Sequence, residues 1–347
     1  MDRYSQFLLH ALTSKDAELP DWENKRDYWH VLRLASSNRV LYSFCKALVR
    51  LEGINNKPDL KLLCEKILKK GDEKIAIFSS TLNRIQESFG QAEIPFLIAK
   101  TAWKLPYIFN DIDLLVKPAQ YQRAVEILAS LQRGKSKHWV SADDKDLFEA
   151  PDFYKIDLHY HFSWLSSTKP FVDPELAWLG TEERDLFGVK CSVPNPTFEW
   201  MVNALNLMFE RFHITLNGCL TLRDSFSKID TEIIREQATK YRWSGTLGRF
   251  IAHLNALNRT LGMEEIEIPG VDCRPIKPSR QVGFPYIFPR NEVVRAYGEQ
   301  WVRRKITDPK MLLYNLVYSP LKSGLSRNEK VAIYGDWYPF DKEPARP

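Results

Sequence analysis

The sequence predicts an α+β fold, in which a small mixed β-sheet with its own helices is flanked by N-terminal and C-terminal helical regions. Apolar residues within 1–90 recur every three or four positions, which is typical of amphipathic helices. Residues 91–192 contain short apolar runs bounded by turn residues, which is typical of strands. From Asn195 the helical spacing returns, and Pro196 is a residue type favoured at the first position of a helix.

The boundaries of these patterns divide the chain into four expected regions. These are an N-terminal helical region at 1–90, a mixed core at 91–192, a helical bundle at 193–269 and a basic C-terminal region at 270–347. Within the first region, Gly53 and Gly71 are predicted to end helices. The core is predicted to contain one helix over 119–132, a hairpin turn at Asp143–Lys145 and strands at Pro95–Ala99, Asp111–Val116, His138–Ser141, Asp146–Ala150, Tyr154–Phe162 and Phe187–Val193.

Composition indicates an ordered globular protein. The 347 residues are 44% hydrophobic and 27% charged, which excludes an intrinsically disordered chain. No apolar run reaches the length of a membrane span and the first residues do not resemble a signal peptide, so no membrane partner is expected. The 5 cysteines form no Cys-x-x-Cys pair, which argues against a zinc ribbon. Scattered thiols in odd number favour a reducing, cytoplasmic location.

The basic excess of the chain lies near its C-terminus. Residues 270–347 hold 14 Lys and Arg against 8 Asp and Glu, whereas the preceding residues hold 35 against 36. Arg274–Arg280 and Arg303–Lys305 are the densest basic stretches, and aromatic residues are interspersed among them. Nucleic acid is a candidate partner of this region, through phosphate contacts. The alternative, which we favour, is a solvated face on a segment that packs against the rest of the protein.

Three carboxylates on predicted strands are the most informative feature of the sequence. Asp111 and Asp113 are two positions apart, so on a strand they point to the same face. Asp157 lies between Ile156 and Leu158 and also projects from a strand with buried neighbours. If the strands pair, the three carboxylates converge, and their mutual repulsion calls for a cation. Mg²⁺ or Mn²⁺ suits such oxygen ligands, and two ions can hold the attacking and leaving oxygens of a phosphoryl transfer.

Two other interpretations of these residues remain open. An acidic pair spaced by one residue is a weak motif, and it also occurs at solvated strand ends. His159 and His161 share a strand face with Asp157, and such a set is compatible with Zn²⁺ or Fe²⁺. The interpretation that we favour is that His159 orients a carboxylate or a phosphate at the edge of the site, and that His161 packs or meets solvent.

The order of these motifs resembles a known family. An apolar strand at Phe96–Thr101, the Asp-Ile-Asp-Leu-Leu-Val stretch at Asp111–Val116 and the acidic-Leu-His motif at Asp157–His159 follow one another, with a helix at Tyr121–Leu131. The pattern, over roughly residues 75–230, is similar to that of the uncharacterised nucleotidyltransferase family of the DNA polymerase β-type nucleotidyltransferase superfamily. The resemblance implies that 91–192 is a catalytic core that moves a nucleoside monophosphate from an NTP such as ATP to an acceptor hydroxyl, releasing pyrophosphate.

The resemblance also implies roles for individual residues. Asp111, Asp113 and Asp157 would be the catalytic, metal-binding carboxylates, with Asp157 as general base, and Lys100, Thr101, Lys104 and His159 would contact the nucleotide. Thr101 stands where the family has a glycine, whose backbone approaches phosphate closely. This departure supports an alternative, in which the fold has lost transfer and binds a nucleotide, RNA or a partner. No motif identifies the acceptor.

Overall fold

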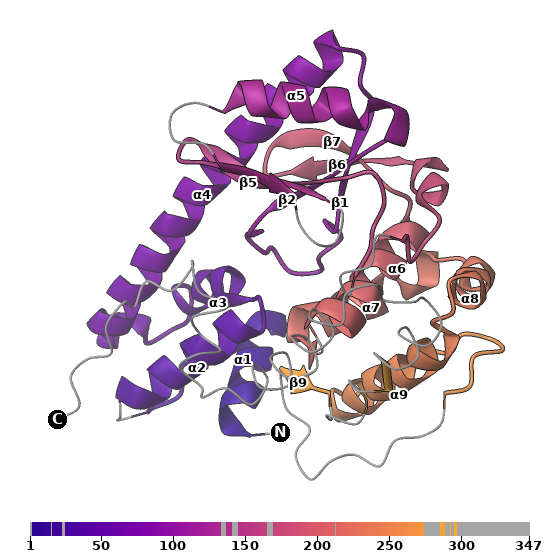
Figure 1. The fold of residues 1–347 in the computed structure, drawn as a ribbon. Coiled ribbons are helices and arrows are strands. Elements are labelled where there is room, and N and C mark those ends of the chain that lie inside the picture. Colours follow the sequence, from indigo (N-terminus) through magenta and orange to yellow (C-terminus); the bar gives the residue numbers. More distant parts are fainter. Residues whose placement is uncertain are drawn as a thin grey trace.

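The computed structural model describes 2–14, 16–22, 25–132, 137–140, 145–164, 169–211, 213–273, 285–288 and residues 292, 295 and 296. Its N-terminal part is helical, as predicted. The helices are α1 (Arg3–Thr13), α2 (Lys25–Ser37), α3 (Leu41–Leu48), the short η1 (Ile54–Asn56) and the long α4 (Pro58–Gln91), which runs from the N-terminal helices to the sheet (Figure 1).

Gly71 does not end a helix, contrary to the sequence prediction. Helix α4 runs from Pro58 to Gln91 and therefore continues for 20 positions beyond Gly71. A Cβ atom at Gly71 would lie 2.6 Å from the Tyr42 ring and 2.8 Å from Ile108. The close packing of α3 against α4 therefore explains why a residue without a side chain is needed at position 71. Gly53 does lie in a turn, with φ of 87°, directly before η1.

The core contains the predicted mixed sheet. Its strand order is β1-β2-β5-β4-β3, in which β2 and β5 are parallel and the other neighbours are antiparallel. The predicted core helix is α5 (Tyr121–Leu131), preceded by η2 (Pro118–Gln120). The strands are β1 (Phe96–Ala99), β2 (Ile112–Val116), β3 (Lys137–Val140), β4 (Asp146–Ala150) and β5 (Phe153–His159).

Several strand boundaries differ from the prediction; Phe187 and Gly188, for example, form a turn, and that strand begins at Val189. β2 begins at Ile112, so Asp111 lies in the bend before it, and β5 ends at His159 rather than Phe162. β3 and β4 pair antiparallel with Val140 opposite Asp146, as expected for a hairpin. The predicted turn residues Asp143 and Asp144 lie outside the described part of the chain.

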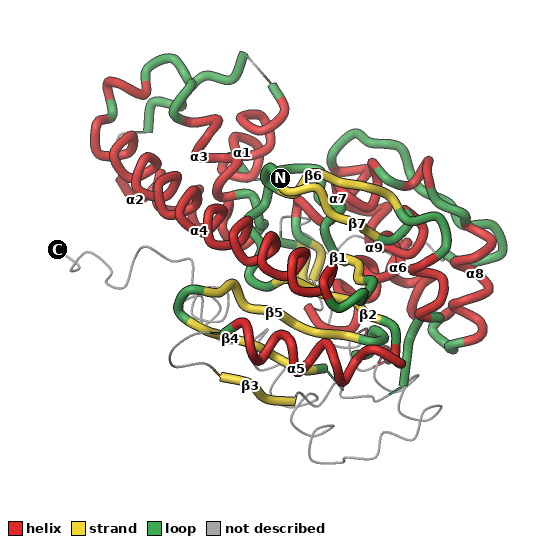
Figure 2. The backbone as a smooth tube through the Cα atoms, turned by 90° about the horizontal axis from the view of Figure 1, so that it is seen from above, coloured by secondary structure: helices red, strands yellow, loops and turns green. Residues whose placement is uncertain are grey.

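One face of the sheet is covered by α4 and α5 (Figures 1 and 2). Alternate residues of β2 point toward these helices because side chains alternate along a strand. Ile112, Leu114 and Val116 are almost completely buried there. The α4 side chains that pack in the same cluster are Phe78, Leu82, Ile85 and Phe89. The carboxylates of β2 and β5 must therefore face the opposite side.

A β-hairpin and a second group of helices follow the sheet. The hairpin pairs β6 (Glu182–Leu186) with β7 (Val189–Val193), after η3 (Pro174–Trp178). Its turn, Phe187-Gly188, has φ of 56° and 86°, as type I′ hairpins require. The helices are α6 (Pro196–Asn206), a π-helical turn (Leu207–Arg211), α7 (Leu216–Asp224), η5 (Phe226–Lys228), α8 (Thr231–Lys240) and α9 (Ser244–Thr260); β8 (His213–Ile214) pairs with β9 (Tyr286–Ile287).

The N-terminal and C-terminal helices share one apolar core. Side chains from α1–α3 and from α6–α9 pack in the same buried cluster, beneath the uncovered face of the sheet (Figure 1). Asn195 caps α6 by accepting a hydrogen bond from the Phe198 N–H. This shared core brings residues far apart in sequence toward the same side of the sheet.

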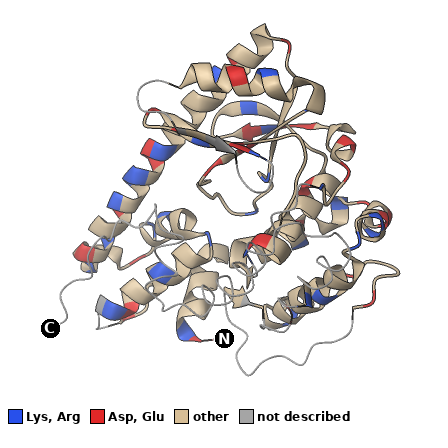
Figure 3. Cartoon of the chain, viewed as in Figure 1, with Lys and Arg blue, Asp and Glu red and all other residues tan. Residues whose placement is uncertain are grey.

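Charged residues are interspersed on the surface of the described chain. Figure 3 shows both basic and acidic residues along α4. The basic stretches at Arg274–Arg280 and Arg303–Lys305 lie outside the described residues. Among the helices that the structure describes, none combines the length and apolarity needed to cross a membrane.

Candidate functional site

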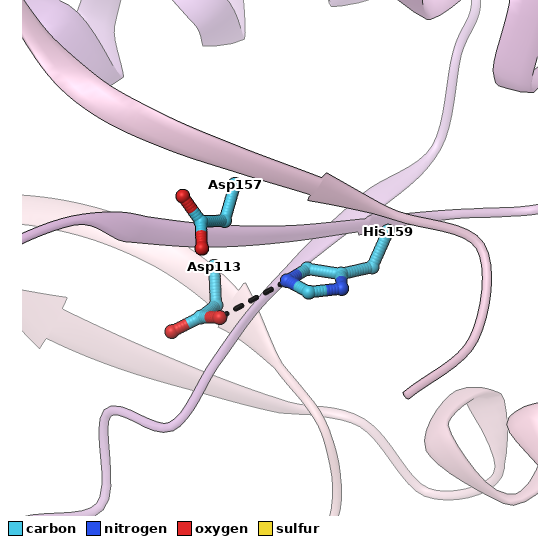
Figure 4. A group of neighbouring side chains, drawn as sticks. All are labelled: Asp113, Asp157 and His159. Carbon is cyan, nitrogen blue, oxygen red and sulfur yellow. Dashed lines mark hydrogen bonds and ion pairs between the residues drawn. The ribbon is translucent and has the colours of Figure 1, made fainter. Parts of the chain in front are cut away.

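Asp113 and Asp157 lie side by side on the two parallel strands. They are direct partners in the register of β2 and β5, and Leu115 faces His159 two positions on. Asp113, Asp157 and His159 are only 7%, 2% and 4% exposed. One ligand atom from each of these three residues lies within 4.8 Å of the others (Figure 4). The parallel pairing, a long-range contact, therefore assembles a compact group that could hold a metal ion.

Asp111 lies at the edge of this group. It is partly exposed because it precedes β2 instead of belonging to the strand. The Lys155 Nζ atom lies 3.5 Å from Asp111 Oδ2 and 3.5 Å from Asp157 Oδ1, so it links the two carboxylates. Asp111 lines the same pocket as Asp113 and Asp157. The structure thus brings the three predicted carboxylates to one pocket, with Asp111 outermost.

Two lysines contact the buried carboxylates. Lys100 Nζ lies 2.6 Å from Asp113 Oδ1, and Lys145 Nζ contacts Asp157 Oδ2. Burial disfavours the charged form of Lys145, but the charges of Asp157, Glu210 and Asp113 raise its pKa above the ordinary value. Lys145 was expected only in a hairpin turn; its position directly before β4, the neighbour of β5, is what brings it to Asp157.

His159 is buried beside Asp113. Its Nε2 atom lies 3.1 Å from Asp113 Oδ1. Burial, together with the charges of Lys145 and Lys100, holds the pKa of His159 well below its usual range, so the ring is neutral at pH 7. A neutral imidazole is the form that binds metals. His161 is also buried but follows the end of β5, and it does not belong to the compact group of Asp113, Asp157 and His159.

The carboxylate of Asp157 is only partly satisfied: Lys145 contacts Oδ2, and Lys155 Nζ lies 3.5 Å from Oδ1. Its Oδ1 atom is buried and accepts no hydrogen bond from the described residues. Burial and the nearby charges of Asp111 and Asp113 raise the pKa of Asp157, although Lys145 and Lys155 act in the opposite direction. A buried carboxylate oxygen without a hydrogen bond is costly, and a bound cation would offset that cost.

Glu199, which the sequence analysis did not select, holds the turn after β1. Its carboxylate accepts the backbone N–H groups of Lys100 at 2.8 Å, Thr101 at 3.0 Å and Ala102 at 3.2 Å. Glu199 is 1% exposed, and burial raises its pKa against the opposing effects of Arg184 and these three bonds. Arg184 also donates to Thr101 Oγ1 at 3.0 Å, so the hydroxyl of Thr101 is engaged within the protein.

A polar stripe on α6 is the sequence signal that would have identified Glu199. Glu199, Asn203 and Asn206 recur at four and three positions in an otherwise apolar helix, and Glu210 continues the stripe on the π-helical turn. Asn203 and Asn206 are each 4% exposed, and the Oδ1 atom of each accepts no hydrogen bond from the described residues. Single π turns occur frequently at functional sites. Asn206 and Glu210 line the pocket.

The pocket is a hollow of about 440 Å³, including its open mouth, between the sheet, the N-terminal helices and α6. Burial raises the pKa of Glu210, but Arg211, Lys100, Lys145 and Arg39 lower it to about 2. The side chain is also 43% exposed to water, so this carboxylate is ionised. The pocket also has an aromatic wall, which consists of Trp103, Tyr107 and Phe109.

Arg39 and Lys104 occupy contrasting positions. Arg39 comes from the turn between α2 and α3, and its guanidinium carbon lies 5.3 Å from the ring centres of both Trp103 and Tyr107. The N-terminal helical region therefore contributes a side chain to the pocket wall. Lys104 forms an ion pair with Asp224, is half exposed and is not part of the pocket wall among the described residues.

Comparison with known proteins identifies the family. Residues 24–258 match the family described as uncharacterised nucleotidyltransferase. The matched range contains the whole sheet, the acidic group and α6, and it extends beyond the range of the sequence resemblance at both ends. No curated protein matches the chain. Because the match spans more than half of the 347 residues, the chain belongs to this uncharacterised nucleotidyltransferase family.

Proposed function

We propose that this protein transfers a nucleoside monophosphate from an NTP to an acceptor hydroxyl and releases pyrophosphate. The observation that carries the proposal is the in-register pair of Asp113 and Asp157 on parallel strands, with Asp111 at the mouth of the same pocket. Carboxylates grouped in this way suit the binding of divalent cations and substrate phosphates together. Membership of a nucleotidyltransferase family supports the same chemistry.

The residues present fit a divalent cation. Asp113 and Asp157 would hold it, with Asp111 as an outer ligand, and the buried Oδ1 atom of Asp157 lacks the hydrogen bond that its burial requires. Carboxylate oxygens favour Mg²⁺ or Mn²⁺. When bound, such ions neutralise phosphate charge and make the acceptor hydroxyl more acidic.

The chain itself would contribute proton transfer and positioning. Asp157 would accept the proton of the acceptor hydroxyl, and its raised pKa makes it a stronger base than an ordinary aspartate. Lys100 is the predicted phosphate contact whose ammonium group lies in the pocket. His159 would orient Asp113 through the contact between Nε2 and Oδ1. Catalysis would then depend mainly on positioning and charge stabilisation.

A specific observation favours one alternative, a fold that binds nucleotides without transferring them. The backbone N–H groups of Lys100, Thr101 and Ala102 are occupied by Glu199, so the turn does not offer them to a phosphate in this conformation. Thr101, in place of the family's glycine, adds a side chain at this point. In this alternative the lysines of the pocket would bind the triphosphate and no pyrophosphate would be released.

The test measures binding and turnover in parallel. Calorimetry with each NTP in Mg²⁺ or Mn²⁺ compares the wild type with the double variant Asp111→Asn/Asp113→Asn, and a pyrophosphate assay is run with candidate acceptors. The control is Asp21→Asn, which removes a carboxylate that is 95% exposed. Metal-dependent binding that is lost only in the double variant supports the site. Binding without pyrophosphate release for any acceptor favours the alternative, and binding that the double variant retains contradicts the site.

A further inference from the structure

Two lysine ammonium groups occupy the acidic group where cations are expected. Lys100 and Lys145 contact Asp113 and Asp157, the two buried carboxylates of the acidic group. The lysine side chains are only 14% and 19% exposed, whereas Lys190, in a surface ion pair with Glu183, is 75% exposed. Partly buried ion pairs are screened less by water than surface pairs, so these two lysines interact strongly with the carboxylates.

The charges in the acidic group balance without any metal. Its carboxylates carry three negative charges and the ammonium groups that contact them carry three positive charges. A divalent cation bound between the carboxylates would meet these ammonium groups at short range, in a medium of lower dielectric constant than water, and would be repelled. The groups counted are the carboxylates of Asp111, Asp113 and Asp157 and the ammonium groups of Lys100, Lys145 and Lys155.

Both lysines also lie near a second position where a negatively charged partner can bind, the pocket itself. Their side chains line the pocket, and each lies close enough to Glu210, at the pocket rim, to affect its ionisation. Arg39 and Arg211 line the same rim, so the rim can attract an anion. A triphosphate in the pocket would therefore offer new negative partners to the two ammonium groups. Its charge would also balance that of two divalent cations.

We propose that Lys100 and Lys145 serve as resident counter-ions of Asp113 and Asp157, and that they exchange to the phosphates of the substrate when divalent cations take their place. This inference rests on the proposed function and assigns Lys145 to phosphate binding. One divalent cation would replace the two positive charges that the departing lysines remove, so the acidic group would stay neutral when it binds the first ion. Metal and triphosphate then bind with positive coupling, because each favours the same arrangement of the lysines.

The exchange predicts that removing one of the lysines changes the affinities for two ligands in opposite directions. Lys145→Met removes the competitor for the cation and also removes a phosphate contact. It is expected to bind Mn²⁺ alone about tenfold more tightly than the wild type and the Mn²⁺ complex of inorganic triphosphate about tenfold more weakly. Calorimetry on the full chain measures both affinities, and inorganic triphosphate removes any influence of base preference.

Three further variants sharpen this experiment. Lys100→Met is expected to show the same opposite changes from the other lysine, so the inference remains testable if Lys145→Met does not fold. Lys145→Arg retains the charge and is expected to bind both ligands with affinities closer to those of the wild type. Lys190→Met is the matched control on the surface hairpin, and both of its affinities are expected to equal those of the wild type.

The outcomes separate this inference from the proposed function. If Lys145→Met and Lys100→Met bind Mn²⁺ alone no more tightly than the wild type, or if both affinities fall together, the lysines have a structural role and the exchange is wrong, while the nucleotide site stands. If the wild type binds neither Mn²⁺ nor its triphosphate complex, the proposed function fails and the exchange fails with it.

Discussion

The carboxylate of Glu199 accepts the backbone N–H of Lys100 at 2.8 Å, and Lys100 has a φ of 59°. A left-handed conformation in a non-glycine residue costs about 1–3 kcal/mol and persists only where its surroundings hold it. Glu199 supplies that restraint with three backbone hydrogen bonds from one turn. The restraint places the Lys100 ammonium group 2.6 Å from Asp113 Oδ1. A buried residue of α6 therefore determines the position of a lysine beside the acidic group.

Replacing Glu199 is expected to affect both stability and nucleotide binding. Glu199→Gln loses one acceptor and places an NH₂ group against backbone N–H groups. We expect the free energy of unfolding to fall by about 1–3 kcal/mol, because buried donors lose their partner. NTP affinity should fall as well, since the Lys100 turn is released. Urea denaturation and calorimetry measure the two effects.

The matched control for Glu199 lies on the same face of α6. Asn203→Leu removes a buried amide that accepts and donates no hydrogen bond among the described residues, so its stability should be unchanged or increased. Equal destabilisation by Glu199→Gln and Asn203→Leu would show that any substitution on this face of α6 lowers stability. It would contradict a specific role of the Glu199 hydrogen bonds.

Asp113 is expected to be essential for turnover and dispensable for the fold. Asp113→Ala removes a candidate metal ligand and the partner of both Lys100 and His159. Pyrophosphate release should fall by at least about 10²–10³-fold, the scale of losing a main electrostatic contact in an active site. Circular dichroism should remain that of the wild type. Turnover at the wild-type rate in this variant would remove the proposed mechanism.

Two glycines of α4 give opposite predictions for the same substitution. Gly71→Ala would place a Cβ atom 2.6 Å from the Tyr42 ring, so we expect a loss of about 1–3 kcal/mol in the free energy of unfolding. Gly90→Ala meets nothing within 4 Å, and the higher helix propensity of alanine should stabilise the protein by up to about 1 kcal/mol. Thermal denaturation distinguishes the two. A gain from Gly71→Ala would contradict the packing of α3 on α4.

His253 should make stability depend on pH. It is 1% exposed, and burial, with the charge of Arg249, lowers its pKa from 6.5 to about 4. The unfolded chain therefore binds a proton more readily than the native protein between these values. The contribution of neutral His253 to the free energy of unfolding is fully present above pH 6.5. The free energy of unfolding should fall, by up to about 3 kcal/mol, as the pH decreases toward 4.

The control for this dependence is His253→Gln, which retains a hydrogen-bonding group near the Tyr286 hydroxyl. Its free energy of unfolding, measured by urea denaturation at a series of pH values, should vary less between pH 6.5 and 4 than that of the wild type. An unchanged pH dependence would assign the effect to other groups.

Local sequence patterns identified most helices and the strands of the core sheet, but not β6, β8 or the full length of α4. The period of three to four residues identified the helices at both ends, and the period of two placed Ile112 and Leu114 on the covered face of β2. The same alternation predicted that Asp113 and Asp157 face the opposite side. These are properties of consecutive residues, so they can be read without knowledge of distant contacts.

The sequence by itself thus determined which residues share a face, and the tertiary structure decided which side chains meet. Glu199 lies about a hundred residues from the turn that it holds, Arg39 reaches the pocket from the N-terminal helices, and Lys145 reaches Asp157 through strand pairing. The prediction that Gly71 ends a helix was wrong because the glycine is required by the Tyr42 ring, 29 positions away in the sequence. Propensity and alternation act between neighbours, whereas packing and ion pairing depend on long-range pairing of the whole chain.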